Sequence, residues 1–124
     1  MKLAVYGTLR PHIDEQGEHV NNTWGGALSN QEYLGRATLP DNLGIFDLGS
    51  FPAVTQVGYE LSNPTVCDVY EIDETALMRC DRIEGHPNFY ERRLVDIAGY
   101  GDCYVYILDD HGGKPIQSGD WYDR

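Results

Sequence analysis

Short apolar runs, separated by glycine, proline and polar residues, dominate this chain and predict many short strands. The first run, residues 2–6, is β-competent and stops abruptly at Gly7, which predicts a buried strand that enters a tight turn. Further strands are predicted at 35–40, 43–48, 65–72, 92–97 and 102–108, with a shorter one after a break within 51–54.

Two turns connect neighbouring strands in this pattern. Asp41-Asn42 is expected to be a turn that joins strands 35–40 and 43–48. Gly99-Tyr100-Gly101 is expected to be the hairpin turn between the last two strands. Residues 8–24, which precede these strands, are expected to be a polar loop.

One segment, residues 74–84, has helical periodicity instead. Asp73 is a suitable N-cap, and Gly85 followed by Pro87 is a typical helix stop. Glu84 falls inside the apolar arc of this helix, whereas its two arginines fall on the far side. The residues that form the arc are Ala76, Leu77, Cys80 and Ile83. Because lone carboxylates are rarely buried without a reason, Glu84 is the first candidate functional residue.

Strands outnumber helices in this prediction. Residues 29–33 are the only other candidate helix, so the strands lack the repeated helical crossovers of a Rossmann sheet. Closing them into a small barrel would remove exposed sheet edges. We therefore predict a β-rich α+β fold, and the length of 124 residues predicts that residues 1–124 form one domain.

Composition limits the binding partners and the cellular compartment that are expected for this chain. Twenty acidic against nine basic residues give a formal net charge of −11, which disfavours nucleic acid and anionic membrane surfaces as partners. Three widely spaced cysteines, Cys67, Cys80 and Cys103, argue against a disulfide framework or structural zinc and fit a reducing compartment. Since no apolar run suits a signal peptide or a membrane span, we expect a cytoplasmic protein.

Few motifs for catalysis are present. The four histidines, at positions 12, 19, 86 and 111, lack metal-binding spacing, and the chain has no Gly-x-Ser-x-Gly elbow. The turn Tyr6-Gly7-Thr8-Leu9-Arg10 remains, because a glycine after a buried strand lets neighbouring backbone N–H groups bind a carboxylate or an oxyanion. An ordinary strand end is the alternative interpretation of this turn.

Several short motifs follow one another in a specific order across nearly the whole chain. They are Val5-Tyr6-Gly7-Thr8-Leu9-Arg10, Leu48-Gly49-Ser50-Phe51-Pro52-Ala53-Val54, Val69-Tyr70-Glu71-Ile72-Asp73, Asp81-Arg82-Ile83-Glu84-Gly85, Phe89-Tyr90-Glu91-Arg92 and Ser118-Gly119-Asp120-Trp121. Each is common alone, but together they resemble the γ-glutamylcyclotransferase-like family, also called AIG2-like.

The resemblance implies a small mixed β-barrel with one or two flanking helices. Its cavity would release 5-oxoproline from a small γ-glutamyl substrate without a metal or organic cofactor. The resemblance places the catalytic acid/base at Glu84 and the substrate-binding loop, acting largely through backbone groups, at Tyr6, Gly7, Thr8 and Leu9. Tyr90 would be a wall of the same cavity, while Trp121 is expected to pack in the core.

This chemistry needs little machinery, because the attacking α-amine and the γ-carbonyl belong to one molecule. One carboxylate can take the proton from the amine and give it to the leaving nitrogen. In water that first transfer is uphill by roughly 5 kcal/mol, and burial of Glu84 among apolar neighbours is expected to raise its pKa and narrow the gap.

Two features depart from the family pattern. Cys67 stands where members often have glycine and is expected to narrow or reshape the barrel wall. The loop 11–24 is longer and more acidic than expected, which suggests a lid or, as we favour, a solvated insertion.

The sequence leaves the activity and the leaving group open. A non-catalytic γ-glutamyl or amino-acid binding module is the alternative to the enzyme. Within the enzyme hypothesis, the leaving group is open among γ-glutamyl-lysine isopeptides, γ-glutamyl peptides and an acyl protecting group. An acidic pocket rim would favour a cationic leaving group such as lysine. The oligomeric state is open as well.

Overall fold

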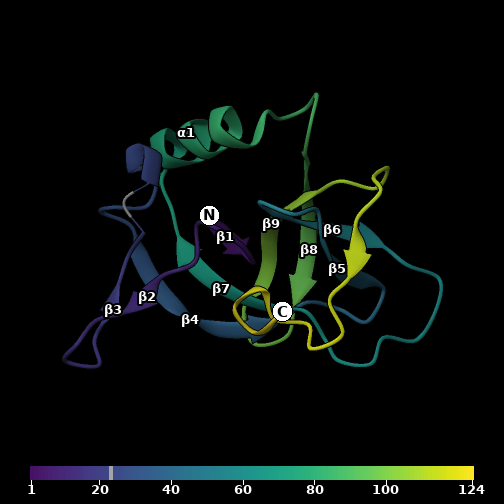
Figure 1. Ribbon diagram of the computed structural model, residues 1–124. Coiled ribbons are helices and arrows are strands. Elements are labelled where there is room, and N and C mark those ends of the chain that lie inside the picture. Colours follow the sequence, from purple (N-terminus) through teal and green to yellow (C-terminus); the bar gives the residue numbers. More distant parts are fainter. Residues whose placement is uncertain (23) are drawn as a thin grey trace.

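The computed structural model describes residues 1–22 and 24–124 and shows a curled, mixed β-sheet that forms a half-barrel (Figure 1). Its strands are β1 (Lys2–Val5), β4 (Glu32–Thr38), β5 (Leu43–Asp47), β6 (Pro52–Gln56), β7 (Val66–Glu71), β8 (Glu91–Ile97), β9 (Gly101–Ile107) and β10 (Lys114–Pro115). A separate two-stranded ribbon consists of β2 (His12–Ile13) and β3 (His19–Val20). In the described part of the chain the one α-helix is α1 (Glu74–Glu84), with short 3₁₀ turns η1 (Trp24–Gly26) and η2 (Trp121–Asp123).

Strand β9 organises the sheet. The hydrogen-bonded order is β10-β5-β6-β9-β1-β7-β4, and β8 pairs along the full length of β9. The pairings of β9 with β1 and with β6 are parallel, and the remaining pairs are antiparallel. Since β1 and β6 both pair with β9, the sheet curls around this strand.

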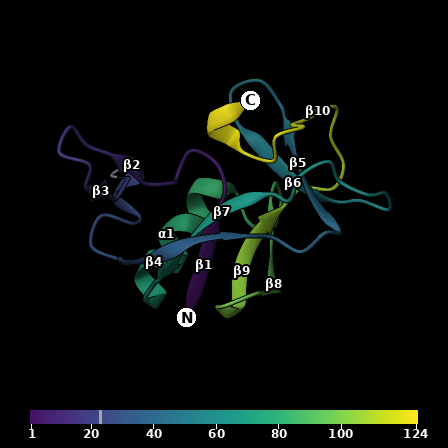
Figure 2. The same ribbon diagram turned by 90° about the horizontal axis from the view of Figure 1, so that it is seen from below.

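Helix α1 packs against one face of the curled sheet (Figures 1 and 2). Alternation along β1 separates two apolar clusters: Leu3 and Val5 pack with the helix, whereas Ala4 and Tyr6 pack in the barrel interior. The loop that follows β1 therefore begins where the two clusters meet.

The predicted helix is confirmed at both ends. The Asp73 carboxylate accepts a hydrogen bond from the Ala76 backbone N–H at 2.7 Å. Gly85 ends the helix in the left-handed conformation, with φ of 67°, which a residue with a side chain rarely adopts. The local signals thus fix where Glu84 lies, at the last residue of α1.

Two local predictions are wrong, and a third is confirmed with an unexpected strand pairing. Residues 29–33 are not helical: they form a turn leading into β4, and Asn21 caps the turn by donating to the Leu28 and Gln31 carbonyls. The polar loop 8–24 contains the ribbon β2–β3. The predicted turn at Asp41-Asn42 is confirmed, since the Leu43 N–H donates to the Pro40 carbonyl at 3.0 Å, but the two strands that it joins pair elsewhere, β4 with β7 and β5 with β6. Turn residues determine where the chain reverses direction, whereas long-range contacts determine which strands pair.

Among the described residues, no helix has the length and apolar character needed to cross a membrane.

Candidate active site

A cavity of about 590 Å³ lies between the end of α1, the loop after β1 and the segment before β6. Tyr6, Pro52, Tyr90 and Tyr106 form its buried end. Glu84 lines the same cavity. The volume falls within the range of about 300–1,000 Å³ typical of small-molecule sites.

The Glu84 carboxyl is partly buried, and its pKa is raised. Burial alone raises its pKa from 4.5 to about 7. It accepts no hydrogen bond from any group in the described part of the chain, so nothing compensates this loss of hydration. Burial raises the pKa of Tyr90 as well, and the charge of Glu84 raises it further, which places the two groups near each other.

The tyrosines around Glu84 are held by backbone groups. The Tyr6 hydroxyl donates to the Tyr106 carbonyl at 2.6 Å and accepts from the Val54 N–H at 3.2 Å. The Tyr90 hydroxyl donates to the Pro52 carbonyl at 2.5 Å. These bonds fix the aromatic walls, because each ring is anchored at its polar tip.

The loop Tyr6–Leu9 offers unused backbone donors. The N–H groups of Gly7, Thr8 and Leu9 donate to no acceptor among the described residues. A Cβ on Gly7 would lie 2.5 Å from Cγ of Pro52, so glycine is required here for space. Three successive free N–H groups beside a cavity can bind an anion or a developing oxyanion.

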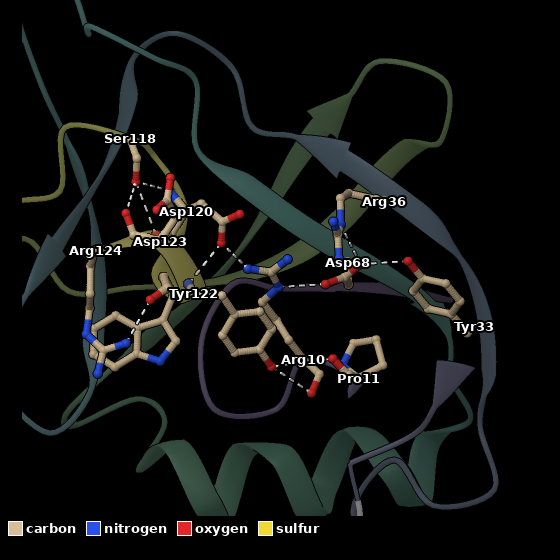
Figure 3. A network of polar contacts seen from close by, with 11 residues as sticks. Arg10, Pro11, Tyr33, Arg36, Asp68, Ser118, Asp120, Tyr122, Asp123 and Arg124 are labelled. Carbon is tan, nitrogen blue, oxygen red and sulfur yellow. Dashed lines mark hydrogen bonds and ion pairs between the residues drawn. The ribbon is translucent and has the colours of Figure 1, made fainter. Parts of the chain in front are cut away.

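A buried arginine fixes the far end of this loop (Figure 3). Arg10 donates from Nε to Asp68 and from Nη1 to Asp120, each at 2.6 Å. Its guanidinium also lies 4.3 Å from the centre of the Tyr122 ring. Asp68 in turn accepts from the Tyr33 hydroxyl at 2.6 Å. The loop is thereby tied to β7 and to the C-terminal segment.

A second polar cluster fixes the end of α1. Asp81, one turn before Glu84, accepts from the Tyr106 hydroxyl at 2.7 Å and forms an ion pair with Arg92. The Arg92 backbone N–H donates to Nδ1 of His86 at 2.9 Å. Because β8 and β9 both hold the helix near Asp81, the position of Glu84 relative to the sheet is fixed.

The structure brings the residues proposed from the sequence onto one cavity. Glu84, Tyr90 and the loop residues Tyr6, Gly7, Thr8 and Leu9 all line it. Trp121 instead packs in the barrel core, as expected.

The structure locates the two departures from the family pattern. Cys67 packs in the barrel core and does not line the cavity, so any effect on the barrel wall occurs away from the cavity surface. In the loop 11–24, the tip around Gly17 is exposed, while Asn22 and Trp24 border the cavity. Asn22 donates to the Thr8 carbonyl at 2.5 Å and so supports the loop after β1.

Several cavity residues were not identified from sequence. Phe51, Pro52 and Phe89 lie in motifs that carry the family resemblance, but their contact with the cavity had no local signal. Tyr106 sits in an alternating strand, where its side chain looks like ordinary core. No group of three or more His, Cys, Asp or Glu side chains in residues 1–22 and 24–124 is arranged to hold a metal ion.

Comparison with known proteins places this site in a family context. Residues 3–123 match the family model described as gamma-glutamyl cyclotransferase, AIG2-like. The chain is 33% identical over 127 residues to the gamma-glutamylcyclotransferase family protein YtfP of Escherichia coli K12, covering 100% of this chain and 98% of that protein.

Solved structures agree on the fold. The solution NMR structure of YtfP from Escherichia coli matches with a TM-score of 0.72 and 28% identity, covering 100% of this chain and 98% of that one. The crystal structure of an AIG2-like protein from Mus musculus has the same fold, with a TM-score of 0.66 and 20% identity over 90% of this chain and 78% of that one. The match over nearly the whole sequence and the shared half-barrel show that the chain belongs to the gamma-glutamyl cyclotransferase, AIG2-like family.

Proposed function

We propose that this protein releases 5-oxoproline from a γ-glutamyl amine or peptide, with Glu84 as the general acid/base. One observation carries the proposal: the Glu84 carboxyl, with its raised pKa, lines a largely apolar cavity beside the N–H groups of the loop after β1, and among residues 1–22 and 24–124 neither has a hydrogen-bond partner. Perturbed carboxyls in clefts are characteristic of catalytic sites.

The reaction is an intramolecular aminolysis. Glu84 takes a proton from the substrate's α-ammonium, and the freed amine attacks the γ-carbonyl to form the ring C–N bond. The protonated Glu84 then donates to the leaving nitrogen as the original amide C–N bond breaks, and the carboxylate is regenerated. The ring nitrogen gives up the second proton of the former ammonium group to the released amine, which departs as an ammonium ion and leaves the lactam N–H.

The pKa of Glu84 suits this proton transfer. An α-amino group has a pKa of about 7.7 to 8.0, so a carboxyl with a pKa of about 7 accepts its proton at a cost of roughly 1 kcal/mol. The same step costs roughly 5 kcal/mol with an ordinary glutamate in water. Burial of Glu84 thus removes most of the free-energy cost that this proton transfer has in water.

The loop after β1 would hold the substrate. The N–H groups of Gly7, Thr8 and Leu9 are available to the α-carboxylate or to the oxyanion formed during attack. Tyr90 would provide a wall against the glutamyl chain, since it lines the cavity near Glu84. The bond from Arg10 N–H to the Gly7 carbonyl, 3.0 Å long, supports the turn.

The test is 5-oxoproline release from a panel of γ-glutamyl peptides and amines, measured by mass spectrometry. Glu84→Gln is expected to lose release, whereas Glu74→Gln, an exposed exchange on the same helix, keeps it. An active Glu84→Gln variant would remove Glu84 from the mechanism. Binding of panel members by calorimetry without any release would instead support a non-catalytic binding module.

A further inference from the structure

The cavity has two chemically different ends. Its buried end contains the tyrosines that surround Glu84, whereas its outer end is exposed and consists of apolar side chains beside the uncharged polar ones of Thr8, Asn22 and Ser50. Trp24 is 58% exposed and Phe89 is 49% exposed, and Phe51 and Ile83 beside them are half-buried. We call Trp24, Phe51, Ile83 and Phe89 the apolar mouth. Exposed aromatics gathered at a cavity entrance indicate a surface for a ligand.

Contacts hold the apolar mouth in place. The rings of Phe51 and Phe89 meet edge to face with centroids 5.9 Å apart, and Phe89 meets Tyr90 in the same way at 5.1 Å. A Cβ on Gly25 would lie 2.6 Å from Cδ1 of Ile83, so η1, which carries Trp24, rests directly on the helix one residue before Glu84. The mouth therefore adjoins the reacting carboxyl.

Charge distinguishes the possible leaving groups. Among the described residues that line the cavity, Glu84 is the one acidic side chain, and none is lysine, arginine or histidine. A cationic leaving group would find no acidic rim beyond Glu84, which the reaction already uses. An anionic one would find no basic side chain, in a chain of net charge −11. A leaving group of either charge would lose hydration against the apolar side chains and would gain no oppositely charged partner.

We propose, on the basis of the proposed function, that the leaving group is a neutral amine with an aromatic or bulky apolar substituent. The glutamyl part would occupy the buried end, and the substituent would lie in the apolar mouth. Trp24 and Phe89 are then the specificity-determining residues, since they are the most exposed apolar members of the lining. The leaving group acquires its proton from Glu84 and departs through the mouth.

The experiment compares four γ-glutamyl amides: those of phenethylamine, ethylamine, the lysine ε-amine and glutamate. kcat/KM for 5-oxoproline release is expected to be at least about tenfold higher for the phenethylamide than for the other three. Trp24→Ala and Phe89→Ala should each lower the ratio of phenethylamide to ethylamide kcat/KM by about tenfold. Tyr59→Ala is the matched control, because Tyr59 is 57% exposed and lies outside this cavity.

The outcomes separate this inference from the proposed function. Equal or faster release from the lysine or glutamate amide overturns the inference while the proposed function stands. An unchanged ratio in both mouth variants does the same. No release from any of the four amides overturns both. Thermal unfolding of each variant, expected to match the wild type at these exposed positions, shows that a changed ratio reflects specificity.

Discussion

Asp68 and Glu84 are both withdrawn from water, but their surroundings differ. Asp68 is fully buried on β7, where one oxygen meets Arg10 and the other meets the Tyr33 hydroxyl and Arg36. Glu84 is less buried and has no partner in the described part of the chain. The more buried carboxylate is thus the better satisfied one. Unmet burial, and not burial itself, distinguishes the candidate acid/base.

The difference follows from what each carboxylate does. Around Asp68, Arg10 and Asp120 join segments that are far apart in sequence (Figure 3). Burial raises the pKa of Asp120, but the hydrogen bonds from Arg10 and the Tyr122 N–H, together with the positive charges of Arg10 and Arg36, outweigh burial and leave the pKa below its ordinary value. The surroundings of Asp120 therefore favour its charged form, whereas the site around Glu84 favours the protonated form. The first holds the fold together, and the second is suited to exchanging a proton.

The largest expected effect comes from neutralising Glu84. Glu84→Gln should lower kcat/KM for 5-oxoproline release by about 10² to 10⁴, because the amide can neither accept nor return the proton. Release is measured by mass spectrometry, and circular dichroism is expected to remain that of the wild type. Asp68→Asn should have the opposite pattern of effects: its main effect should be a lower free energy of unfolding. If the two exchanges had the same pattern of effects, the distinction between the carboxylates would fail.

Replacing Arg10 should make the buried Asp68 carboxylate destabilising instead of stabilising. Arg10→Met leaves Asp68 buried without its main cation and should reduce the free energy of unfolding by about 3–5 kcal/mol, measured by urea denaturation. Adding Asp68→Asn to Arg10→Met removes the stranded charge, and part of the loss should return. A double variant no more stable than Arg10→Met would show that uncompensated charge is not the cause.

Sequence was sufficient for the helix and for the position of Glu84, because both depend on neighbours in the chain. The Asp73 cap, the apolar face and the Gly85 stop all act within a few residues. The family motifs then supplied the loop residues, which periodicity could not.

Sequence was insufficient where distant segments meet. Arg10 bonds to residues 58 and 110 positions away, and no local pattern shows such a pairing. The apolar mouth likewise combines η1, the segment before β6, the end of α1 and the segment after α1. The turn at Asp41-Asn42 was predicted from its local residues, but the pairing of β4 with β7 was not, for the same reason.

The pH dependence of the rate should follow the Glu84 carboxyl. kcat/KM is expected to fall about tenfold per pH unit below about pH 7, because protonation removes the base. Rates are measured on the preferred amide between pH 5 and 9. Glu84→Gln should lack this limb in whatever residual activity it retains. A wild-type limb centred near pH 4.5 would mean that Glu84 has no raised pKa in solution.

The smallest expected effect is the change that Glu84 makes to the free energy of unfolding as pH rises. This effect can be measured separately from that of the Asp68 cluster. A carboxyl with a pKa of 4.5 in the unfolded chain and about 7 in the folded one binds more protons when folded, so the free energy of unfolding falls as pH rises between these values. The two pKa values correspond to roughly 3 kcal/mol at pH 8, and partial exposure of the carboxyl should reduce this to on the order of 1–2 kcal/mol.

Urea denaturation of the wild type and Glu84→Gln at pH 4 and pH 8 measures this cost. The variant should be similar in stability at pH 4 and more stable than the wild type at pH 8. Asp120, with its lowered pKa, contributes stability that is present above about pH 4 and lost below it, but both proteins contain it and the difference cancels. A variant less stable than the wild type at pH 8 would show that the Glu84 carboxylate is satisfied in the fold, which would remove the physical basis for its role as a base.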